Sequence, residues 1–356
     1  MAATAALRAR AIAFYLPQFH PTPENDEWWG PGFTEWTNVV QAKPLFDGHY
    51  QPHMPSHLGL YDLRVPEVRE AQAELARSHG IEAFCYWHYW FAGRQILQRP
   101  FEDVLSSGQP DYPFCLAWAN ESWSRSWLGD SRDLLVKQRY SAEDDREHAR
   151  WLLTAFADPR YLRVRGRPLF LIYRPKDLPD PRRTTDTLRT ESTRAGLPEP
   201  FVLGVNAWGG ADHRILGFDG IVSFEPQLSA LGDQTGEGLN IYDYAEARAR
   251  MWAVRDLAAY PSIVVSWDNT PRRGLAGTVF TGATPAAFER GVREIVESTL
   301  ARPLDDRLVF INAWNEWAEG NHLEPDEKHG LGHLEAVRGV LATAPRQSSE
   351  RMRVGV

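Results

Sequence analysis

The stretch RLVFINAWNEWAEGNHLEP (307–325) joins an apolar run to a segment rich in acids, amides and tryptophans. Its run LVFI (308–311) is typical of a buried strand, because continuous apolar residues suit a parallel strand covered on both faces. Glu316 and Glu319 follow the strand closely, with Trp317 between them. Barrel enzymes gather catalytic groups at the C-terminal ends of such strands, so this stretch predicts both a strand and a site.

Seven further apolar runs of the same kind precede it, and amphipathic segments separate most of them. The runs are AIAFYL (11–16), IEAFCYW (81–87), PFCLAWA (113–119), PLFLIY (168–173), FVLGVN (201–206), DGIVSF (219–224) and SIVVSW (262–267). Segments with helical periodicity and helix start signals cover 65–80, 141–158, 245–258 and 284–300. Eight strand-then-helix units predict an α/β protein with a (β/α)8 TIM barrel. The fifth unit is the weakest, since only ADHRILGF (211–218) separates its two strands.

The alternative fold is an open, doubly wound sheet, which would need a Gly-rich phosphate-binding turn after its first strand. The segment LPQFHPTPEN (16–25) is not such a turn. No repeat or low-complexity linker divides the chain, so we expect one domain. Its predicted parts are a lead at 1–10, a catalytic barrel at 11–345 with a long loop after the first strand, and a tail at 346–356.

Composition narrows the class of partner. The chain has 356 residues and a net charge of −8, which disfavours nucleic acid and anionic membranes as partners. No apolar run approaches the roughly 20 residues that span a bilayer. Arg8 and Arg10 interrupt the N-terminal apolar segment, so we do not expect a signal peptide. Cys85 and Cys115 lie in apolar runs and are expected to be buried, reduced thiols, which favours a cytoplasmic protein. The oligomeric state stays open.

Tryptophan is unusually frequent, with 14 residues. Only Trp151 and Trp252 fall in helical patterns, whereas the other twelve lie near strand ends or in the first long loop. Core packing would scatter these rings more evenly. Flat aromatic side chains at strand ends therefore predict a cleft whose rings stack on a sugar chain or shape the path that it takes.

Paired carboxyls among aromatic rings are the usual equipment of glycoside chemistry. We therefore predict Glu316 and Glu319 as catalytic. Trp314 and Trp317 would exclude water and raise a carboxyl pKa, which suits a general acid at neutral pH. The predicted substrate-binding residues lie close to the same strand ends: Tyr15, His20, Trp36, Trp87, His88, Trp118, Asn120, Glu121, Trp123, Arg125, Tyr173, Asn206, Trp208, Glu225, Trp267, Asn315 and Trp317. We further expect Trp36, Trp118, Trp123 and Trp317 to be partly exposed in the cleft, and Glu121 and Glu225 to converge on it with the glutamate pair.

The spacing of the pair leaves two arrangements open. Two acids three residues apart on one loop approach the same region of a sugar, while the common mechanisms need carboxyls on both sides of the scissile bond. Either both glutamates act from one side, or a distant acid such as Glu121 or Glu225 completes a conventional pair.

Other chemistries have less support. HYQPHMPSH (49–57) is a proline-broken loop without a helical histidine pair or a cysteine pair, so we predict neither a metal site nor a cofactor. No G-x-S-x-G elbow or Walker motif occurs in the sequence.

Five motifs together resemble the WbsX-type family, which is labelled as glycosyltransferases and is related to glycoside hydrolase family 99. They are AFYLPQFHPTPENDEWWGPGFTEWTNV (13–39), GIEAFCYWHYWF (80–91), CLAWANESWSRSW (115–127), DPRYLRVRGRPLFLIYRP (158–175) and NAWNEWAEGNHLEPD (312–326). The resemblance covers about residues 11–338. It implies a (β/α)8 barrel acting on glycosidic bonds of a polysaccharide or oligosaccharide.

The resemblance also implies a retaining mechanism in which the sugar's own 2-hydroxyl attacks C1 and forms a 1,2-anhydro sugar. The family 99 motif E-x-x-E falls on Glu316, as the base for that hydroxyl, and on Glu319, as the acid/base for the leaving group. Family 99 enzymes usually have E-W-H-E, whereas this chain has Ala318 in place of the histidine, so endo-mannosidase specificity is not carried over.

Two alternatives accompany this hypothesis. The first is a glycosyltransferase in cell-surface polysaccharide synthesis, whose nucleotide-sugar donor Arg125 and Arg174 could help to bind. The second is a noncatalytic carbohydrate-binding barrel.

Overall fold

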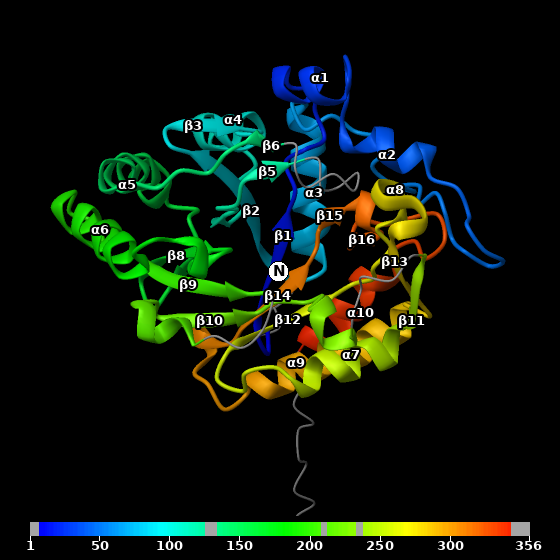
Figure 1. Ribbon diagram of the computed structural model, residues 1–356. Helices are drawn as coiled ribbons and strands as arrows, with labels where there is room; N and C mark the ends of the chain where they lie inside the picture. Colours follow the sequence, from blue (N-terminus) through cyan, green and yellow to red (C-terminus); the bar gives the residue numbers. More distant parts are fainter. Residues whose placement is uncertain (1–6, 125–133, 208–211, 233–237, 343–356) are drawn as a thin grey trace, which may run out of the picture.

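The computed structural model describes residues 7–124, 134–207, 212–232 and 238–342. Eight parallel strands form a closed barrel, because the first strand pairs with both the second and the last (Figure 1). In chain order they are β1 (Arg10–Tyr15), β2 (Ile81–Phe91), β4 (Phe114–Trp118), β8 (Arg167–Ile172), β9 (Phe201–Asn206), β10 (Gly220–Ser223), β12 (Tyr260–Val264) and β14 (Leu308–Asn312). Each predicted run overlaps one of these strands, so the TIM-barrel prediction is confirmed.

Helices follow seven of the barrel strands and surround them (Figure 1). They are α3 (Pro66–Ser78), α4 (Arg99–Ser107), α5 (Ala142–Phe156), α6 (Pro181–Arg194), α7 (Tyr244–Ala253), α9 (Pro285–Thr299) and α10 (Gly332–Leu341). The side chains of Ser141 and Thr284 cap α5 and α9 by accepting backbone hydrogen bonds. In the described part of the fifth unit, the only helix is the short 3-10 helix η3 (His213–Leu216), in agreement with the very short helix that the sequence predicts there.

Shorter helices and strands lie in the segments that connect the barrel strands and the surrounding helices. The segment after β1 contains α1 (Pro23–Trp29) and α2 (Glu35–Gln41), which lie together at the top of Figure 1. The remaining elements are β3 (Arg94–Ile96), β5 (Trp123–Ser124), β6 (Leu134–Val136), β7 (Arg163–Val164), η2 (Pro175–Asp177), η4 (Leu228–Leu231), β11 (Asn240–Asp243), α8 (Thr270–Arg273), η5 (Gly274–Ala276), β13 (Thr278–Thr281), η6 (Leu304–Asp306), β15 (Asn315–Glu316), η7 (Trp317–Glu319) and β16 (Asn321–His322).

Aromatic rings fill part of the barrel interior, where aliphatic side chains are more usual. Phe14 stacks on Trp87 with ring centroids 4.9 Å apart, and it also contacts Phe224 at 5.2 Å and Phe310 at 5.7 Å. These four rings come from β1, β2, β14 and the end of β10. Large rings close the barrel below its C-terminal end, so any open space above them has an aromatic floor.

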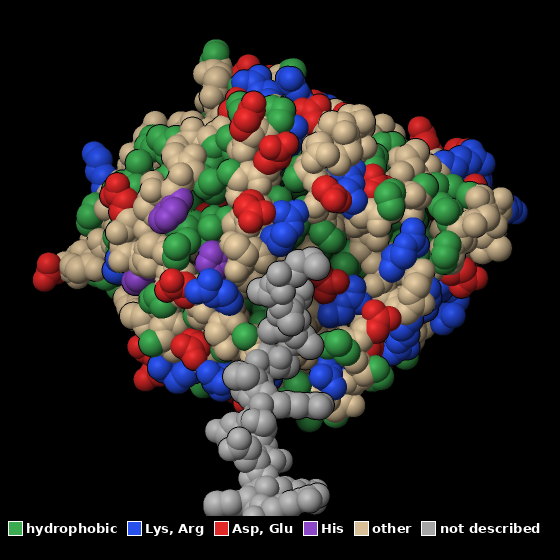
Figure 2. All heavy atoms as spheres, turned by 180° about the vertical axis from the view of Figure 1, so that it is seen from behind, with side chains coloured by type: hydrophobic (Ala, Val, Ile, Leu, Met, Phe, Trp, Pro, Cys, Tyr) green, Lys and Arg blue, Asp and Glu red, His purple; other side chains and the backbone are tan. Residues whose placement is uncertain are grey.

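Acidic and basic side chains are interspersed on the face shown in Figure 2. This mixture agrees with a chain of 39 basic and 47 acidic residues. Both cysteines are buried and unpaired, as predicted. Within the described ranges, no helix has the length and apolar character needed to cross a bilayer.

Candidate active site

A cleft of about 650 Å³ opens at the C-terminal end of the barrel. This volume is in the range of small-molecule and oligosaccharide-sized sites. Glu316 and Glu319 line it together with residues in or just after each of the eight barrel strands. The described lining includes no histidine or cysteine, and the histidines of the loop at 49–57 lie elsewhere.

The last barrel strand leads into a small hairpin that carries the glutamate pair. β15 and β16 pair in antiparallel fashion, and η7 forms the turn between them. Asn315 accepts a hydrogen bond from the Leu16 N–H (2.7 Å) and donates one to the Leu16 carbonyl (3.0 Å). Asn321 accepts one from the Val265 N–H (3.1 Å). The two asparagines therefore anchor the hairpin to the ends of β1 and β12.

Gly320 allows the hairpin to approach the segment after β12. Its φ is +58°, and a Cβ there would lie 2.9 Å from the Cβ of Asp268. The N–H of Asp268 donates to the Glu319 carbonyl at 2.6 Å. Glycine satisfies both the positive φ and the close contact, so this residue fixes the position of Glu319.

Arg272 and Glu35 complete a buried cluster of charges around the pair. Nη1 of Arg272 donates to Glu319 at 2.6 Å, and Nη2 donates to Glu316 at 3.2 Å. The same guanidinium contacts Glu35 Oε2 at 2.9 Å through Nη2 and at 3.1 Å through Nε. Arg272 comes from α8 and Glu35 from the first turn of α2. Three carboxyls thus share one cation, which leaves an excess of negative charge.

The pKa values of the cluster reflect this excess. Burial, and then the neighbouring charge of Glu319, raise the pKa of Glu316, although Arg272 opposes the rise. Burial also raises the pKa of Glu319. Burial alone would lower the pKa of Arg272, but the three carboxyls raise it above its usual value. The pair is therefore disposed to hold a proton near neutral pH, as a general acid requires.

Sequence reasoning did not identify Glu35 or Arg272. Glu35 directly precedes Trp36, which was selected, and Arg272 lies five residues after Trp267. Isolated acidic and basic residues in loops are usually solvated, so neither position stood out before the fold brought the loops together.

The cleft contains several of the residues predicted to bind substrate. Those that line it are Trp87, Glu121, Trp123, Tyr173 and Trp267, together with the predicted catalytic pair. The rings of Trp87, Tyr173 and Phe224 contact one another at 5.1–6.2 Å and form its floor.

Three predicted substrate-binding residues instead point away from the barrel axis. Tyr15 donates to Gln72 of α3 at 2.7 Å, and His88 lies 2.9 Å from His148 of α5 through their Nε2 atoms. Trp118 packs against the same His148 ring. Side chains alternate along a strand, so each of these residues lies next to an inward-facing one and faces the surrounding helices.

Other predicted residues hold the loops in place. Trp36 donates to the Tyr61 carbonyl, and Trp317 donates to Glu324. Asn120 donates to the Arg174 carbonyl. The expectation of partial exposure is therefore wrong for Trp36, Trp118 and Trp317, which are buried, and also for Trp123, which lines the cleft but is only 9% exposed. His20 and Asn315 are buried and do not line the cleft. Asn206, at the end of β9, does not line it either. Arg125 and Trp208 fall outside the described residues.

Glu225 does not converge on the cleft with the other acids. Its carboxylate binds Arg248 of α7 at 3.1 Å and accepts the Val264 N–H at 3.1 Å. Both charged side chains are 7% exposed. The expected convergence therefore holds for Glu121, Glu316 and Glu319 but is wrong for Glu225, because a buried arginine behind the strands holds that carboxylate.

Comparison with known proteins agrees with this architecture. The model of the family described as glycosyltransferase WbsX matches residues 11–337. The "Uncharacterized protein WxcX" of Xanthomonas campestris pv. campestris, in strains B100 and ATCC 33913, is 42% identical over 355 residues. The match takes in 97% of this chain and 51% of each relative. The chain therefore spans about half the length of the curated relatives it matches.

Solved structures share the fold. The GH99 endo-alpha-mannosidase from Bacteroides thetaiotaomicron has a TM-score of 0.58 and 14% identity, over 93% of this chain and 95% of that one. A "Glycoside hydrolase-like protein" has a TM-score of 0.60 and 14% identity, over 97% and 98% of the two chains. At this identity the likeness concerns the barrel and not the reaction.

Proposed function

This chain belongs to the WbsX glycosyltransferase family, and on that premise we propose that it cleaves or transfers a glycosidic bond of an oligosaccharide or polysaccharide, with retention of configuration. Glu316 and Glu319 are the proposed catalytic carboxyls. The observation that carries this proposal is that both glutamates line one cleft and bind one arginine, above a floor of aromatic rings. Paired carboxyls and aromatic rings are what glycosidic chemistry requires.

In the first step, Glu316 removes the proton of the sugar's 2-hydroxyl, and O2 forms a bond to C1. The bond from C1 to the leaving oxygen breaks, and Glu319 gives that oxygen a proton. The product is a 1,2-anhydro sugar. In the second step, Glu319 takes a proton from water or an acceptor hydroxyl, whose oxygen attacks C1. The C1–O2 bond breaks, and Glu316 returns its proton to O2. Two inversions at C1 give net retention.

Two features favour action from one side of the sugar. Because both carboxyls bind the same guanidinium, they approach a ligand from the same wall of the cleft. The excess of negative charge would also stabilise the positive charge that develops at C1 in an oxocarbenium-like transition state.

The proton must lie on Glu319 and not on Glu316 when the reaction begins. Arg272 lies closer to Glu319 than to Glu316. Without substrate, the arginine therefore favours ionised Glu319 and leaves the proton on Glu316. A bound sugar favours the proton on Glu319 instead. Its 2-hydroxyl donates to ionised Glu316, while its leaving oxygen accepts from protonated Glu319, so substrate binding stabilises the reactive distribution.

The roles of the two glutamates can be tested with variants. An active substrate would first be found among aryl glycosides and purified bacterial polysaccharides. Glu319→Gln should retain most activity on an aryl glycoside whose leaving group departs as an anion, but lose at least about 100-fold on an unactivated glycoside. Glu316→Gln should be severely impaired on both. Equal losses for the two variants on both substrates would contradict these roles.

A trapping experiment separates this mechanism from the conventional retaining pair. Glu121 lines the same cleft and is bound to Arg174 at 2.8 Å, so it is the alternative nucleophile. A 2-deoxy-2-fluoro glycoside with a good leaving group has no 2-hydroxyl and should leave no covalent adduct. Intact-protein mass spectrometry that finds a sugar attached to Glu121 or Glu316 would overturn the mechanism.

Transfer is the second candidate function, because the family is described as a glycosyltransferase. A nucleotide-sugar donor needs cations for its diphosphate. Arg174 already binds Glu121 (2.8 Å) and Asp177 (2.7 Å), so its charge is largely neutralised. Calorimetric binding of a nucleoside diphosphate would favour transfer from such a donor. Sugar binding without turnover, unchanged when both glutamates are replaced, would instead indicate a noncatalytic barrel.

A further inference from the structure

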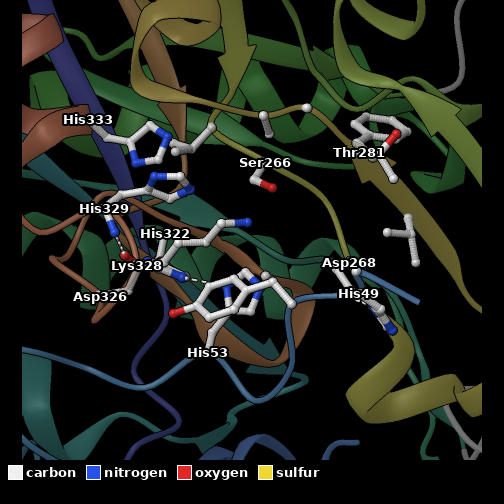
Figure 3. A pocket seen from close by; sticks show the side chains of 18 of the residues that line it. His49, His53, Ser266, Asp268, Thr281, His322, Asp326, Lys328, His329 and His333 are labelled. Carbon is white, nitrogen blue, oxygen red and sulfur yellow. Dashed lines mark hydrogen bonds and ion pairs between the residues drawn. The ribbon is translucent and has the colours of Figure 1, made fainter. Parts of the chain in front are cut away.

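A second cavity of about 110 Å³ is lined in part by Gly320 and His322 of the hairpin and shares no described lining residue with the cleft. Figure 3 shows this cavity from close by. Its lining is rich in imidazoles. The histidines are His49, His53, His322, His329 and His333. They come from the loop after β1, from β16 and from the segment that follows it, so folding gathers residues from both ends of the chain.

Three buried side chains in this cavity have the spacing of a metal site. One ligand atom each of His53, His322 and Asp326 lies within 4.8 Å of the other two. His53 Nδ1 and His322 Nε2 are 3.0 Å apart. If both nitrogens bound one ion at the usual bond length of about 2.05 Å, they would subtend an angle of about 94° at it, which four- to six-coordinate ions accept. Two atoms bound to one ion at about 2.05 Å are at most about 4.1 Å apart, so a carboxylate oxygen 4.8 Å from a nitrogen would have to move by more than about 0.7 Å to complete the set.

The hydrogen bond of His322 fixes which nitrogen is available. Its Nδ1 lies 2.9 Å from the Glu324 carbonyl, which can only accept, so Nδ1 carries the hydrogen. The lone pair is then on Nε2, which points at His53. Metal-binding histidines typically donate their second N–H to a carbonyl or carboxylate in this way. Without an ion, His53 Nδ1 donates to this lone pair, so an ion would take the place of that proton.

Asp326 is a buried carboxylate without a cationic partner. It is 3% exposed, and among the described residues no lysine, arginine or histidine forms an ion pair with it. Its Oδ1 accepts the His329 N–H at 2.6 Å, which orients the carboxylate. Buried carboxylates are costly unless they are paired or coordinate a metal.

A separate polar group also faces this cavity without a partner. Nε2 of His333 is buried and makes no hydrogen bond among the described residues. A water bound to an ion in the cavity would give it one. An anion would suit the cavity less well, because its buried groups offer lone pairs and a carboxylate, and the ammonium of Lys328 is held over the Tyr50 ring, 4.7 Å from its centroid.

We propose that His53, His322 and Asp326 bind one divalent transition-metal ion, with Zn²⁺ as the reference ion. The site lies outside the cleft, so the ion takes no part in breaking the glycosidic bond, and the inference does not rest on the proposed function. His322 stacks on Trp317 with ring centroids 3.7 Å apart. An ion here would hold the loop after β1 against the hairpin that carries the glutamate pair. The sequence predicted no metal because its local motifs could not show that residues 53, 322 and 326 meet.

The test uses the full chain without an affinity tag, stripped of metal with a chelator. Calorimetry with Zn²⁺ should find one equivalent bound, and Co²⁺ should produce visible absorption bands that Zn²⁺ abolishes. His53→Gln should weaken Zn²⁺ binding by about 100-fold, and Asp326→Asn, which keeps the side-chain volume, by at least about 10-fold. His57→Gln is the control, since this exposed histidine hydrogen-bonds its neighbour Ser56 and does not line the cavity.

The outcomes are distinct. If metal-free wild-type protein binds no stoichiometric Zn²⁺ or Co²⁺, the proposal is overturned, and the two histidines form only a hydrogen-bonded pair. Binding that is unchanged in both His53→Gln and Asp326→Asn also overturns it. If one variant does not fold, the wild-type titration and the other variant still decide. A Zn²⁺-dependent rise in Tm that His57→Gln retains and Asp326→Asn loses supports the site.

Discussion

Arg272 controls the charge of the glutamate pair. A nearby cation favours ionised carboxyls, and burial and mutual repulsion oppose it. Replacing Arg272 with Gln should therefore raise the pKa of both Glu316 and Glu319 further, and the pH profile of kcat/KM should move to higher pH. Arg272→Lys keeps the charge and should move the profile less. ¹³C-carboxyl NMR of glutamate-labelled protein would follow the same groups directly. A profile unchanged in Arg272→Gln would show that the arginine does not set their protonation.

Glu225 provides the contrasting case of an acid that supports the fold. Breaking a buried ion pair from one side typically costs about 3–5 kcal/mol, because the other charge stays buried. Glu225→Gln should therefore lower the free energy of unfolding by about this much in urea denaturation, since Arg248 remains behind. Glu294→Gln is the matched control, because this half-exposed carboxylate lies 3.5 Å from the same arginine and should cost at most about 1 kcal/mol. If Glu225→Gln instead loses sugar binding while its stability is unchanged, Glu225 belongs to the ligand site.

Among single residues, the sequence identified those that stand in a distinctive local setting. Glu316 and Glu319 were found because they follow a strand and are flanked by tryptophans. Arg272 and Glu35 were missed because their importance comes from contacts between loops that are 237 residues apart. No local sequence pattern predicts a contact between residues so far apart in the chain.

At the scale of elements, the boundary of the second strand explains why His88 does not line the cleft. The apolar run IEAFCYW (81–87) predicts a strand that ends at Trp87, but β2 continues to Phe91. Residues 88–90 therefore alternate instead of forming a loop. Tyr89 faces the cleft, whereas His88 and Trp90 face α5, where Trp90 donates to Asp144 at 2.8 Å. Side chains of a strand point alternately to its two faces. If this alternation is extended from residue 87 to residue 91, it separates the side chains that face the cleft from those that face the helices.

Glu324 is a support for the β15–β16 hairpin. Its two oxygens accept hydrogen bonds from Tyr61 (2.8 Å), Gln72 (2.6 Å) and Trp317 (2.7 Å). Glu324→Gln replaces one acceptor oxygen with a donor, so at least one buried donor loses its partner. We expect a loss of about 1–3 kcal/mol in unfolding free energy. Glu327→Gln, an exposed change in the same turn, should leave stability within about 0.5 kcal/mol of wild type. Equal stabilities for the two variants would contradict this role.

At the scale of the whole molecule, the barrel was predictable because each of its eight strands is a continuous apolar run. That pattern follows from coverage on both faces and needs no knowledge of distant contacts. The lining of the cleft was only partly predictable, since many of its residues come from loops that follow the strands. Among the described aromatic residues near the strand ends, Trp87, Trp123, Tyr173 and Trp267 line the cleft. Trp317 packs in the hairpin, and Trp90 and Trp118 pack against His148 of α5.

Two sets of buried groups give stability a pH dependence with opposite signs. Burial lowers the pKa of His20 to about 4 and that of His88 to about 3. The unfolded chain therefore binds more protons at these positions below about pH 7.5, and their contribution to stability grows as the pH rises to about that value. Burial, then Glu319, raises the pKa of Glu316 to about 8, and burial raises that of Glu324 to about 7. Here the folded chain holds protons that the unfolded chain has lost.

Above about pH 7.5 the unfolded histidines have lost nearly all of their protons, so the histidine contribution no longer changes. The free energy of unfolding should therefore fall between about pH 7.5 and 8.5, by at most about 1.4 kcal/mol per pH unit for each such carboxyl. Urea denaturation across this range would measure the slope. Glu316→Gln removes one of the titrating groups and should flatten the slope, whatever its effect on stability at a single pH. Glu327→Gln, on the surface, should leave the slope unchanged. A slope that is equally steep in Glu316→Gln would mean that Glu316 is already ionised at about pH 7.5. At that pH the pair would then lack the proton that its proposed chemistry requires.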